Sequence, residues 1–385
     1  MTTRKRAFLD QPTGTEGLYL ADAWRHRNTV ARLSAILETW GYFPVHSPMI
    51  DYHDAFSGLI SSDMAREIYR LIDREGELIA IRSDATLFLA KHMARFVRRE
   101  VLPVRVYYSE SILRHARRED ISRNEYFQIG AELIGDTGFT GELEILALAL
   151  KTLDAVLPGR CAVHVGHRTI VERIVAPLDR GTRDVVLDAL RDHDRQALIR
   201  GFSSQYTREQ ARALTKLLTT IQDPEAFRAE TAGQTHVLPH ALSTAVEDEL
   251  GHVLELTTML EQAHGVMNDG ASSDVIRVDL SEIGSQSYHT GIAFRAYADG
   301  AEAAVASGGR YDSLYGHFGI HTPAVGFSIM LRRLERLSAI ESLPELQGVP
   351  ADRKSFLSRL AEAEKRRERG ERIVFEFTGA EAENE

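Results

Sequence analysis

The sequence predicts an α+β protein in which a block of helices interrupts one antiparallel sheet. Two strand-like runs, at residues 103–118 and 124–135, are separated by a charged loop, and this order indicates an antiparallel hairpin. After a strand-like run at residues 161–167, further strand-like runs begin at residue 275, beyond a long stretch of helical pattern. If strands on both sides of that stretch share one sheet, segments far apart in the chain will line one face of it.

The composition is that of an ordinary globular protein and argues against several functions. The 385 residues, 43% of them hydrophobic, are enough for two or three domains with a sizeable core. Acidic residues outnumber basic ones, 56 to 46, which disfavours binding to nucleic acid through many phosphate contacts. The only cysteine, Cys161, lies in a strand-like run and is expected to be a buried core thiol. No signal peptide or apolar run of about twenty residues is found, which favours the cytoplasm and no membrane contact.

Hydrophobic spacing predicts the elements of the first half of the chain. Apolar residues at helical spacing begin at Leu20, and Gly41 is a good helix stop. Residues 76–86 are strand-like and lead into a helix. The remaining elements predicted here are a helix over 87–99, the hairpin, a helix over 141–157 and a strand over 161–167.

The second half contains the helical block and the returning strands. Thr207 to Gln210 and Thr244 to Glu247 have the spacing of capping boxes. Strands are predicted over 275–283, 288–298, 302–312 and 323–329, followed by a helix over 330–340. We therefore expect a core over 1–167 and 271–340, a helical insertion over 168–270, and a charged tail over 341–385. In the tail we expect a solvent-facing helix over 354–372 and a small edge strand over 373–377.

The stretch SEIGSQSYHTGIAF, residues 281–294, predicts a binding site with limited chemistry. It contains hydroxyl groups, a glutamine and a histidine but no lysine or arginine. Such side chains can hydrogen-bond a small polar molecule, but they cannot steady a phosphate that becomes more negative during a reaction. In the interrupted-sheet interpretation this stretch lies beside RSDAT, residues 82–86, and FQIGAE, residues 127–132.

Polar residues in these two segments predict what the site binds. Ser83 or Asp84 is a natural N-cap for the helix that follows, and capping alone would explain it. Gln128 and Glu132 share one face of a strand, which would otherwise be a solvent face. Asp84, Gln128 and Glu132 are acceptors suited to the ammonium group of an amino acid. Arg114 and Tyr311 are donors suited to a carboxylate or phosphate.

The most specific string is SGGRYDSLYGHFG followed by PAVGFSIMLRRLERL, which closely resembles the third motif of histidyl-tRNA synthetases, a class II family. The resemblance extends over about residues 10–337. Residues 103–135 resemble the second motif of that family, residues 37–56 resemble the first, and RSDAT resembles its substrate-reading Arg-Pro-Glu-Gly-Thr. The resemblance implies a class II aminoacyl-tRNA synthetase-like antiparallel sheet flanked by helices.

The resemblance also assigns roles to individual residues. Arg114 and Arg333 match the two class-defining arginines that hold ATP phosphates, and would here be a phosphate- or carboxylate-binding remnant. His289 stands where the synthetases have tyrosine, and Asp84 where they have the longer glutamate. The histidine-binding positions implied are Asp84, Thr86, Gln128, Glu132, Tyr288, His289 and Tyr311.

Three departures from the family fall in its nucleotide-binding half. Gly284 replaces the arginine that steadies the α-phosphate, and losing such a donor typically costs about 10²–10³ in rate. Residues 113–116 lack the glutamate of the second motif at Ala116, and Arg332 replaces the glutamate before the last arginine. A shifted alignment would bring Arg277 to the lost position, but its strand-like context argues against this. Activation of histidine is therefore expected to be crippled.

These departures are similar to those of the regulatory subunits of ATP phosphoribosyltransferase, and only 48 residues (385 − 337) follow Leu337, which argues against an anticodon-binding domain. The similarity implies a protein without catalytic residues, metal or cofactor. It implies a hetero-oligomer, of hetero-octameric size, with the short catalytic subunit of ATP phosphoribosyltransferase, which performs the first step of histidine biosynthesis. The subunit would be needed for activity and for feedback inhibition by histidine, bound either in the synthetase-like pocket or at a subunit interface. It would dimerise through residues 37–56 and bind no tRNA.

Two other classes of function are compatible with the motifs. Arg114 and Arg333 are retained, so the chain could be a truncated histidyl-tRNA synthetase-like ligase that forms an aminoacyl-adenylate. Histidine-dependent pyrophosphate exchange would identify that enzyme. An RNA-binding module without catalysis is the third class. The acidic charge disfavours it, and salt-dependent binding of histidine tRNA would support it.

Overall fold

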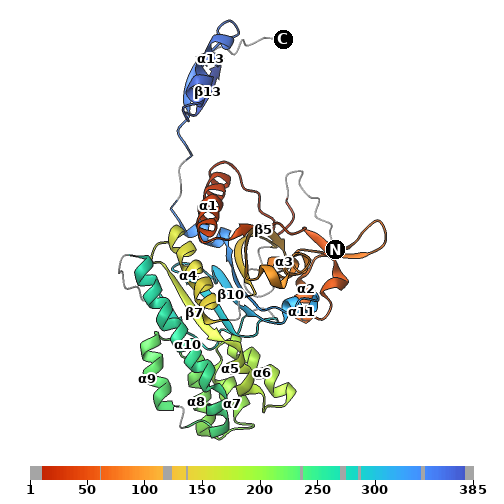
Figure 1. Cartoon of the computed structure of the whole chain (residues 1–385), viewed down its shortest axis with the longest axis vertical. Coiled ribbons are helices and arrows are strands. Elements are labelled where there is room, and N and C mark those ends of the chain that lie inside the picture. Colours follow the sequence, from red (N-terminus) through yellow and green to blue (C-terminus); the bar gives the residue numbers. More distant parts are fainter. Residues whose placement is uncertain are drawn as a thin grey trace, which may run out of the picture. The chain divides into compact units, whose positions relative to one another are not determined.

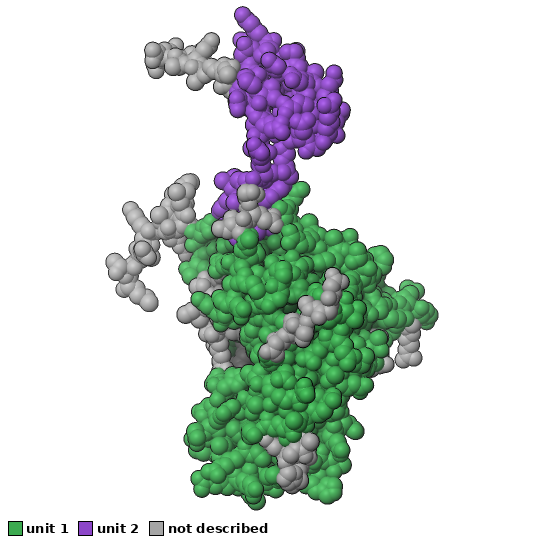
Figure 2. All heavy atoms as spheres, turned by 90° about the vertical axis from the view of Figure 1, so that its left-hand side faces the viewer, with its two compact units in different colours: residues 1–17, 26–339 green, residues 18–25, 340–385 purple. Residues whose placement is uncertain are grey.

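The computed structural model describes residues 11–60, 62–115, 124–135, 138–234, 237–268, 275–284, 288–339 and 343–377. The chain forms two compact units, which Figure 2 colours separately. The larger unit comprises residues 1–17 and 26–339, and the smaller comprises residues 18–25 and 340–385. The larger unit holds the main sheet and the cavity described below.

An eight-stranded sheet is the centre of the larger unit, and its order is β1-β5-β6-β11-β10-β9-β7-β8. Its inner pairs are all antiparallel, which confirms the expected antiparallel sheet, while the edge pairs β1–β5 and β7–β8 are parallel. Parallel neighbours need a long crossover, and the helical block supplies it between β7 and β8. The strands are β1 (Phe43–Pro44), β5 (Val104–Leu113), β6 (Glu125–Ile134), β7 (Cys161–His167), β8 (Ile276–Val278), β9 (Ile292–Ala298), β10 (Ala306–Tyr311) and β11 (Ala324–Met330).

The sheet joins the two halves of the chain at its middle. β5 and β6 form the predicted hairpin, and β11 pairs with β6 from the other side. In this register Gly326 lies opposite Glu132, and Met330 lies opposite Gln128. The segments before and after the helical block therefore meet on one surface, as the sequence predicted.

Helices cover one face of the sheet and enclose the largest core. α1 (Leu20–Thr39) and α4 (Phe139–Val156) supply apolar side chains that pack on the strands, and α10 (His240–Met267) adds its C-terminal half. Cys161 lies in this core, as predicted, and burial raises the pKa of its thiol to about 12. The α1 helix ends two residues before Gly41, at the predicted stop. Figure 1 shows α4 and α10 lying side by side.

The opposite face of the sheet carries shorter elements. These include α3 (Ala85–Met93), which starts in the RSDAT segment, and a three-stranded sheet of order β2-β4-β3. A second core, rich in tyrosine and phenylalanine, joins these elements to the main sheet. The short elements are β2 (Ile50–Tyr52), η1 (His53–Phe56), α2 (Ser62–Glu67), β3 (Arg70–Ile72), β4 (Leu78–Ile81), η2 (Arg99–Val101) and α11 (Leu314–His317).

The helical block has a core of its own that continues onto β8, through Val278 and Leu280. Thr207 and Gln210 form the predicted capping box at the start of α8. The second predicted box, at Thr244, is wrong, because α10 begins at His240 and carries Thr244 inside its first turns. Figure 1 shows the block gathered beyond β7. Its helices are α5 (Arg168–Val175), α6 (Arg180–Arg191), α7 (Arg195–Phe202), α8 (Arg208–Thr219), α9 (Pro224–Gln234) and α10.

The chain leaves the main sheet through α12 (Leu331–Leu337), and the smaller unit contains a strand–helix–strand arrangement. α13 (Phe356–Arg367) and β13 (Ile373–Phe377) lie in segments where the sequence predicted a helix and a strand. β12 (Gln347–Ala351), parallel to β13, was not predicted. Its sequence QGVPA contains glycine and proline and few strand-favouring residues, so the pairing with β13 determines it.

Candidate functional site

A cavity of about 1070 Å³ lies on the face of the sheet opposite α4. Its walls come from α3, from the central strands β6, β10 and β11, from the segment before β9, and from α5 and α6. All nine residues selected from the sequence line it: Asp84, Thr86, Arg114, Gln128, Glu132, Tyr288, His289, Tyr311 and Arg333. The described residues contain no group of three or more metal-ligating side chains, and none of their helices could cross a membrane.

Alternation along β6 divides its side chains between the core and the cavity. Ile129 and Ala131 belong to the core under α4, whereas Gln128 and Glu132 line the cavity. Both polar side chains are buried, so the solvent-face interpretation of FQIGAE is wrong. The amide of Gln128 donates to the sulfur of Met330 at 3.3 Å, the residue opposite it on β11.

Asp84 caps α3 and also takes part in the cavity wall. One of its carboxylate oxygens accepts a hydrogen bond from the backbone N–H of Leu87 at 2.8 Å, which is the predicted N-cap. The hydroxyl of Tyr288 donates to both oxygens at 3.3 Å. Burial raises the pKa of Asp84 above its ordinary value. The carboxyl is thus held in position by the fold before any ligand binds.

Glu132 is the second carboxyl of the cavity and is completely enclosed. The hydroxyl of Thr86 donates to one of its oxygens at 2.7 Å, and the hydroxyl of Tyr311 donates to the other. Burial raises its pKa to about 8, although both hydrogen bonds act in the opposite direction. An ammonium group placed between Asp84 and Glu132 would favour the ionised form of both.

Gly326 makes room for that carboxyl from the neighbouring strand. A Cβ atom at this position would overlap the carboxylate of Glu132 and would lie 2.7 Å from the carbonyl oxygen of Ala131. Only glycine fits so close an approach of strand and side chain. The floor of the cavity is therefore fixed by backbone geometry.

Arg114 and Arg333 enter the cavity from different elements. Arg114 directly follows β5, and its guanidinium lies over the ring of Tyr126 at 5.2 Å. Arg333 lies on α12 and donates to the carbonyl oxygen of Ala304 at 2.8 Å. Both are placed to meet an anionic group of a ligand. Their assignment to phosphate or carboxylate stays a prediction.

The position that lacks the synthetase arginine is closed to any side chain. Gly284 has a φ of +78°, and a Cβ atom there would overlap the ring of His289. Burial, together with the positive charges of the nearby Arg168 and Arg295, lowers the pKa of His289 to about 3, so the ring is neutral at physiological pH. Arg277 lies on β8 and does not line the cavity, so it does not replace the missing cation.

The other two positions that depart from the synthetase motifs are Arg332 and Ala116. Arg332 is buried in the body of the protein, where it pairs with Glu335 at 2.8 Å and with Glu16 at 2.9 Å. It does not line the cavity, so its charge stabilises the packing of α12 and not a ligand. Ala116 lies outside the described residues.

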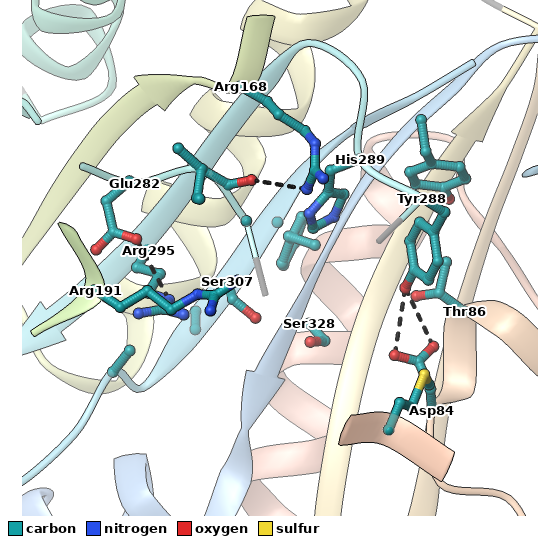
Figure 3. A pocket seen from close by; sticks show the side chains of 18 of the residues that line it. Asp84, Thr86, Arg168, Arg191, Glu282, Tyr288, His289, Arg295, Ser307 and Ser328 are labelled. Carbon is teal, nitrogen blue, oxygen red and sulfur yellow. Dashed lines mark hydrogen bonds and ion pairs between the residues drawn. The ribbon is translucent and has the colours of Figure 1, made fainter. Parts of the chain in front are cut away.

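Four arginines on the far side of the cavity were missed by the sequence analysis. Figure 3 shows Arg191 and Arg295 together at the end away from Asp84, and Arg168 reaching to the side of His289. Arg183 also lines the cavity. For Arg295 the sequence did contain a signal of a functional position, because a charged residue stands between the apolar residues of the strand-like run FRAYA. The helical arginines gave none, because the packing of α5 and α6 decides which of their faces meets the cavity.

Comparison with known proteins agrees with this geometry. A family model for histidyl-tRNA synthetase matches residues 14–334. The fold is similar to a solved structure of an ATP phosphoribosyltransferase regulatory subunit/histidyl-tRNA synthetase from Bacillus halodurans C, with a TM-score of 0.83 at 21% identity over 98% of this chain and 96% of that one. Histidyl-tRNA synthetase from Nostoc sp. PCC 7120 gives a TM-score of 0.78 at 17% identity over 98% and 88%.

Sequence relatives are more specific than the fold. Two proteins named ATP phosphoribosyltransferase regulatory subunit are similar to this chain. The one from Geobacter sulfurreducens is 30% identical over 326 residues, covering 82% of this chain and 70% of the relative. The one from Bacillus pumilus is 28% identical over 348 residues, covering 89% and 85%.

The fold and the cavity define a protein of the class II aminoacyl-tRNA synthetase type. The architecture predicted from the three motifs is thereby confirmed. The chain belongs to the histidyl-tRNA synthetase family and, within it, to the ATP phosphoribosyltransferase regulatory subunits.

Proposed function

We propose that this chain controls ATP phosphoribosyltransferase, the first enzyme of histidine biosynthesis, by binding its short catalytic subunit and by sensing histidine. One observation carries the proposal. The cavity brings together the side chains that the synthetase resemblance assigns to histidine binding, with Asp84 and His289 as changes, while the position assigned to the catalytic arginine is a glycine whose Cβ would overlap the ring of His289. Such a site binds an amino acid without activating it.

Histidine fits the acidic end of the cavity in its charge pattern. Its ammonium group would lie between Asp84 and Glu132, with Gln128 as a further partner, and its carboxylate would face Arg114. Each hydrogen bond to a charged group contributes about 1.5–3 kcal/mol, so a few of them suffice for binding without a nucleotide. Thr86, Tyr288 and Tyr311 hold the two carboxyls in place.

Inhibition requires that histidine bind two arrangements of the complex unequally. A coupling of about 1–3 kcal/mol between effector and active site is typical, and it must come from contacts that differ between the arrangements. Tyr288 and Asp84 join segments on opposite sides of the helical block, so a ligand that contacts both affects how the two segments meet. The cavity is thus a suitable effector site.

A dimer through the first-motif region completes the proposal. Apolar side chains there are exposed in the single chain, although the neighbouring Tyr42 is buried in the core. The exposed ones are Phe43, Met49, Ile50 and Tyr52. They lie on or beside the edge strands β1 and β2, and a stable interface over them would bury more than about 1,200 Å². Other faces then remain for the catalytic subunit in a hetero-octamer.

The test mixes the purified chain with the catalytic subunit of the same organism. Light scattering should show a complex larger than either component, and phosphoribosyl transfer to ATP should rise when this chain is added. Histidine should then lower the rate. A chain that forms no complex and leaves the transferase rate unchanged would refute the proposal.

A second function is supported by one observation. Arg114 and Arg333 both line the cavity, as a ligase that forms an aminoacyl-adenylate requires. Histidine-dependent exchange of pyrophosphate into ATP by the purified chain measures that reaction. Turnover above the level of an Arg114→Gln variant would show an enzyme, and no difference between the two would exclude this reaction.

A further inference from the structure

The cavity is larger than an amino acid requires and has two chemically different ends. Its volume of about 1070 Å³ is at the top of the roughly 300–1,000 Å³ typical of pockets for drug-sized ligands. The acidic lobe consists of Asp84, Thr86, Gln128, Glu132, Tyr288 and Tyr311. The basic lobe, which the proposed function does not use, consists of Arg168, Arg183, Arg191 and Arg295.

Two arginines of the basic lobe are held in place by backbone carbonyl groups. Arg183 donates to the carbonyl oxygens of Ala176 at 2.9 Å and Leu178 at 3.3 Å, just beyond the end of α5. Its Nε is buried and has no hydrogen-bond partner among the described residues. Arg168, at the start of α5, reaches the carbonyl oxygen of Ile283 at 3.5 Å. The positions of these charges are therefore set by the fold.

The acidic residues near these arginines leave positive charge available. Arg168 pairs with Glu172, and Arg191 pairs with Asp188, in both cases at 2.7 Å within one helix. Both carboxylates are more than half exposed, and ion pairs with such exposed carboxylates contribute little, so a ligand can replace the carboxylate.

Arg295 differs because its partner is buried. It lies 3.4 Å from Glu282, whose other oxygen accepts from Tyr297 at 2.6 Å. Burial raises the pKa of Glu282, and the nearby arginine counteracts this. A carboxyl that burial drives toward the neutral form compensates Arg295 only in part. Figure 3 shows Arg295 and Glu282 at the same end of the cavity as Arg191.

Apolar side chains complete this lobe. Val171 and Val175 of α5, and Leu187 of α6, line the cavity next to the arginines. Val171 and Val175 are almost completely buried, whereas Leu187 is half-buried and offers apolar surface to a ligand. A flat apolar ring joined to a phosphate would cover the wall and meet the arginines together.

We propose that the basic lobe is a second ligand site, which binds a small molecule carrying a phosphate group and an apolar ring, such as a nucleoside monophosphate. Arg168, Arg191 and Arg295 bind the phosphate, and Leu187 contacts the ring, with the buried Val171 and Val175 packed behind it. Arg114 and Arg333, the phosphate-binding positions of the synthetase resemblance, do not belong to it.

His289 and Gly284 lie at the junction of the two lobes. Figure 3 shows the ring of His289 between Arg168 and Tyr288. Its Nδ1 is buried without a hydrogen-bond partner among the described residues, so this ring presents a polar atom at the boundary. The absence of a side chain at Gly284 is what lets the ring occupy this position. The ring of His289, which fills the space beside Gly284, thus separates the two binding sites.

The test is calorimetric titration of the full chain with adenosine monophosphate as the probe, and with adenosine and inorganic pyrophosphate as comparisons. Adenosine monophosphate should bind at least about tenfold more tightly than adenosine, because the phosphate meets several arginines. Arg168→Gln, Arg191→Gln and Arg295→Gln should each weaken it by about tenfold. Arg180→Gln, at the other end of α6 and outside the cavity, is the matched control and should change nothing.

Three results would overturn the second site. These are equal affinity for adenosine and its monophosphate, equal binding by the Arg191→Gln and Arg180→Gln variants, and loss of binding in Arg114→Gln, which would place the probe at the synthetase-like position. Histidine added to saturation should leave the probe bound, and competition between them would also contradict the proposal. Because Arg191 is exposed, its variant should keep the unfolding temperature of the parent. Complex formation with the catalytic subunit is measured separately, so its failure does not affect this result.

Discussion

The hydroxyl of Tyr288 donates hydrogen bonds to both carboxylate oxygens of Asp84, each at 3.3 Å, although the two residues are 204 positions apart in the chain. Asp84 starts the helix that follows β4, and Tyr288 lies shortly before β9. The contact forms only when the strands on both sides of the helical block have joined. The acidic lobe is therefore a product of the completed sheet.

Replacing either buried carboxyl should weaken histidine binding. Glu132→Gln and Asp84→Asn keep nearly the same shape but remove the charge that a buried ammonium group needs. We expect an affinity loss of roughly 10- to 100-fold, since a charged hydrogen bond contributes about 1.5–3 kcal/mol. Calorimetry measures the affinity, and assays of the complex should show reduced feedback inhibition. Asparagine is also a good N-cap, so Asp84→Asn should leave α3 intact.

Glu125→Gln, on the same strand and outside the cavity, is the matched control and should bind histidine as the parent does. Unchanged binding in both cavity variants would mean that histidine binds elsewhere, and an interface between subunits would become the better candidate.

Histidine binding should release protons near neutral pH. The pKa of Glu132 is about 8 in the free chain, so its carboxyl is protonated below that value, and a bound ammonium group favours the ionised form. Raising the pH toward 8 removes the cost of this deprotonation, so Glu132 should strengthen affinity by up to about tenfold per pH unit between about pH 6 and 7.5. Titrations in buffers of different ionisation enthalpy count the protons. Glu132→Gln should lose this contribution, and an identical pH dependence in the variant would contradict the assignment.

Arginine at Gly284 should not restore a synthetase. The position has a φ of +78° and no space beside His289, so the new side chain cannot occupy the cavity without moving that ring. We expect no histidyl-tRNA formation and a loss of stability exceeding the roughly 1–2 kcal/mol of backbone strain alone. Gly76→Arg supplies the control, because Gly76 has a φ of +88° with nothing near its Cβ position. Robust charging of tRNA by Gly284→Arg would show that the other departures matter little.

The buried His167 should make the fold sensitive to acid. Burial is the main cause that lowers the pKa of His167 to about 4 in the folded chain. On unfolding the pKa returns to the ordinary value of 6.5. Between these values the unfolded chain binds a proton that the folded chain does not, so stability falls as the pH falls from about 6.5 toward 4, by up to about 1.4 kcal/mol per pH unit. Urea unfolding of His167→Gln at pH 7.5 and pH 5 should show a smaller loss than the parent. His46→Gln, at a largely exposed position, should match the parent, and an equal loss in all three proteins would exclude His167 as a source.

Charge on the first-motif surface should prevent the dimer. Ile50→Glu and Tyr52→Glu place carboxylates on exposed positions of β2, so the monomer should fold while an apolar interface there cannot form. Light scattering should report half the mass of the parent. Val185→Glu, an exposed apolar position of α6, is the control and should stay dimeric. A dimer that survives both β2 variants would place the interface on another surface.

The sequence was informative wherever periodicity and motif agreed. The β5–β6 hairpin and the cap at Asp84 follow from local patterns, because alternation and capping act within a few residues, whereas the meeting of the two halves in one sheet was inferred from the order of strands along the chain. The six residues of the acidic lobe, together with His289, Arg114 and Arg333, were assigned to the site from motif resemblance, and the structure brings all nine to one cavity. Their roles stay a prediction.

The features that the sequence did not predict depend on how helices and strands pack against one another, and local sequence patterns carry no information about that packing. Thr244 has the spacing of a cap, but α10 continues through it because the preceding turn already starts the helix at His240. The sequence did not single out Arg168 or Arg191, because only the packing of α5 and α6 in the folded chain brings these side chains to the cavity. Gly284 was read as a lost side chain, and the structure shows in addition that the backbone and His289 exclude one.

Gly326, which gives the carboxylate of Glu132 its space, also limits how this cavity can change over evolutionary time. Any other residue there would collide with Glu132 and with the backbone of β6, so the hollow cannot be filled by single substitutions that leave the sheet intact. The segment before β9 carries Gly284 at the position that the synthetase resemblance assigns to the catalytic arginine. A descendant of this fold can therefore abandon its reaction quickly and yet inherit an empty binding chamber, available for a new ligand.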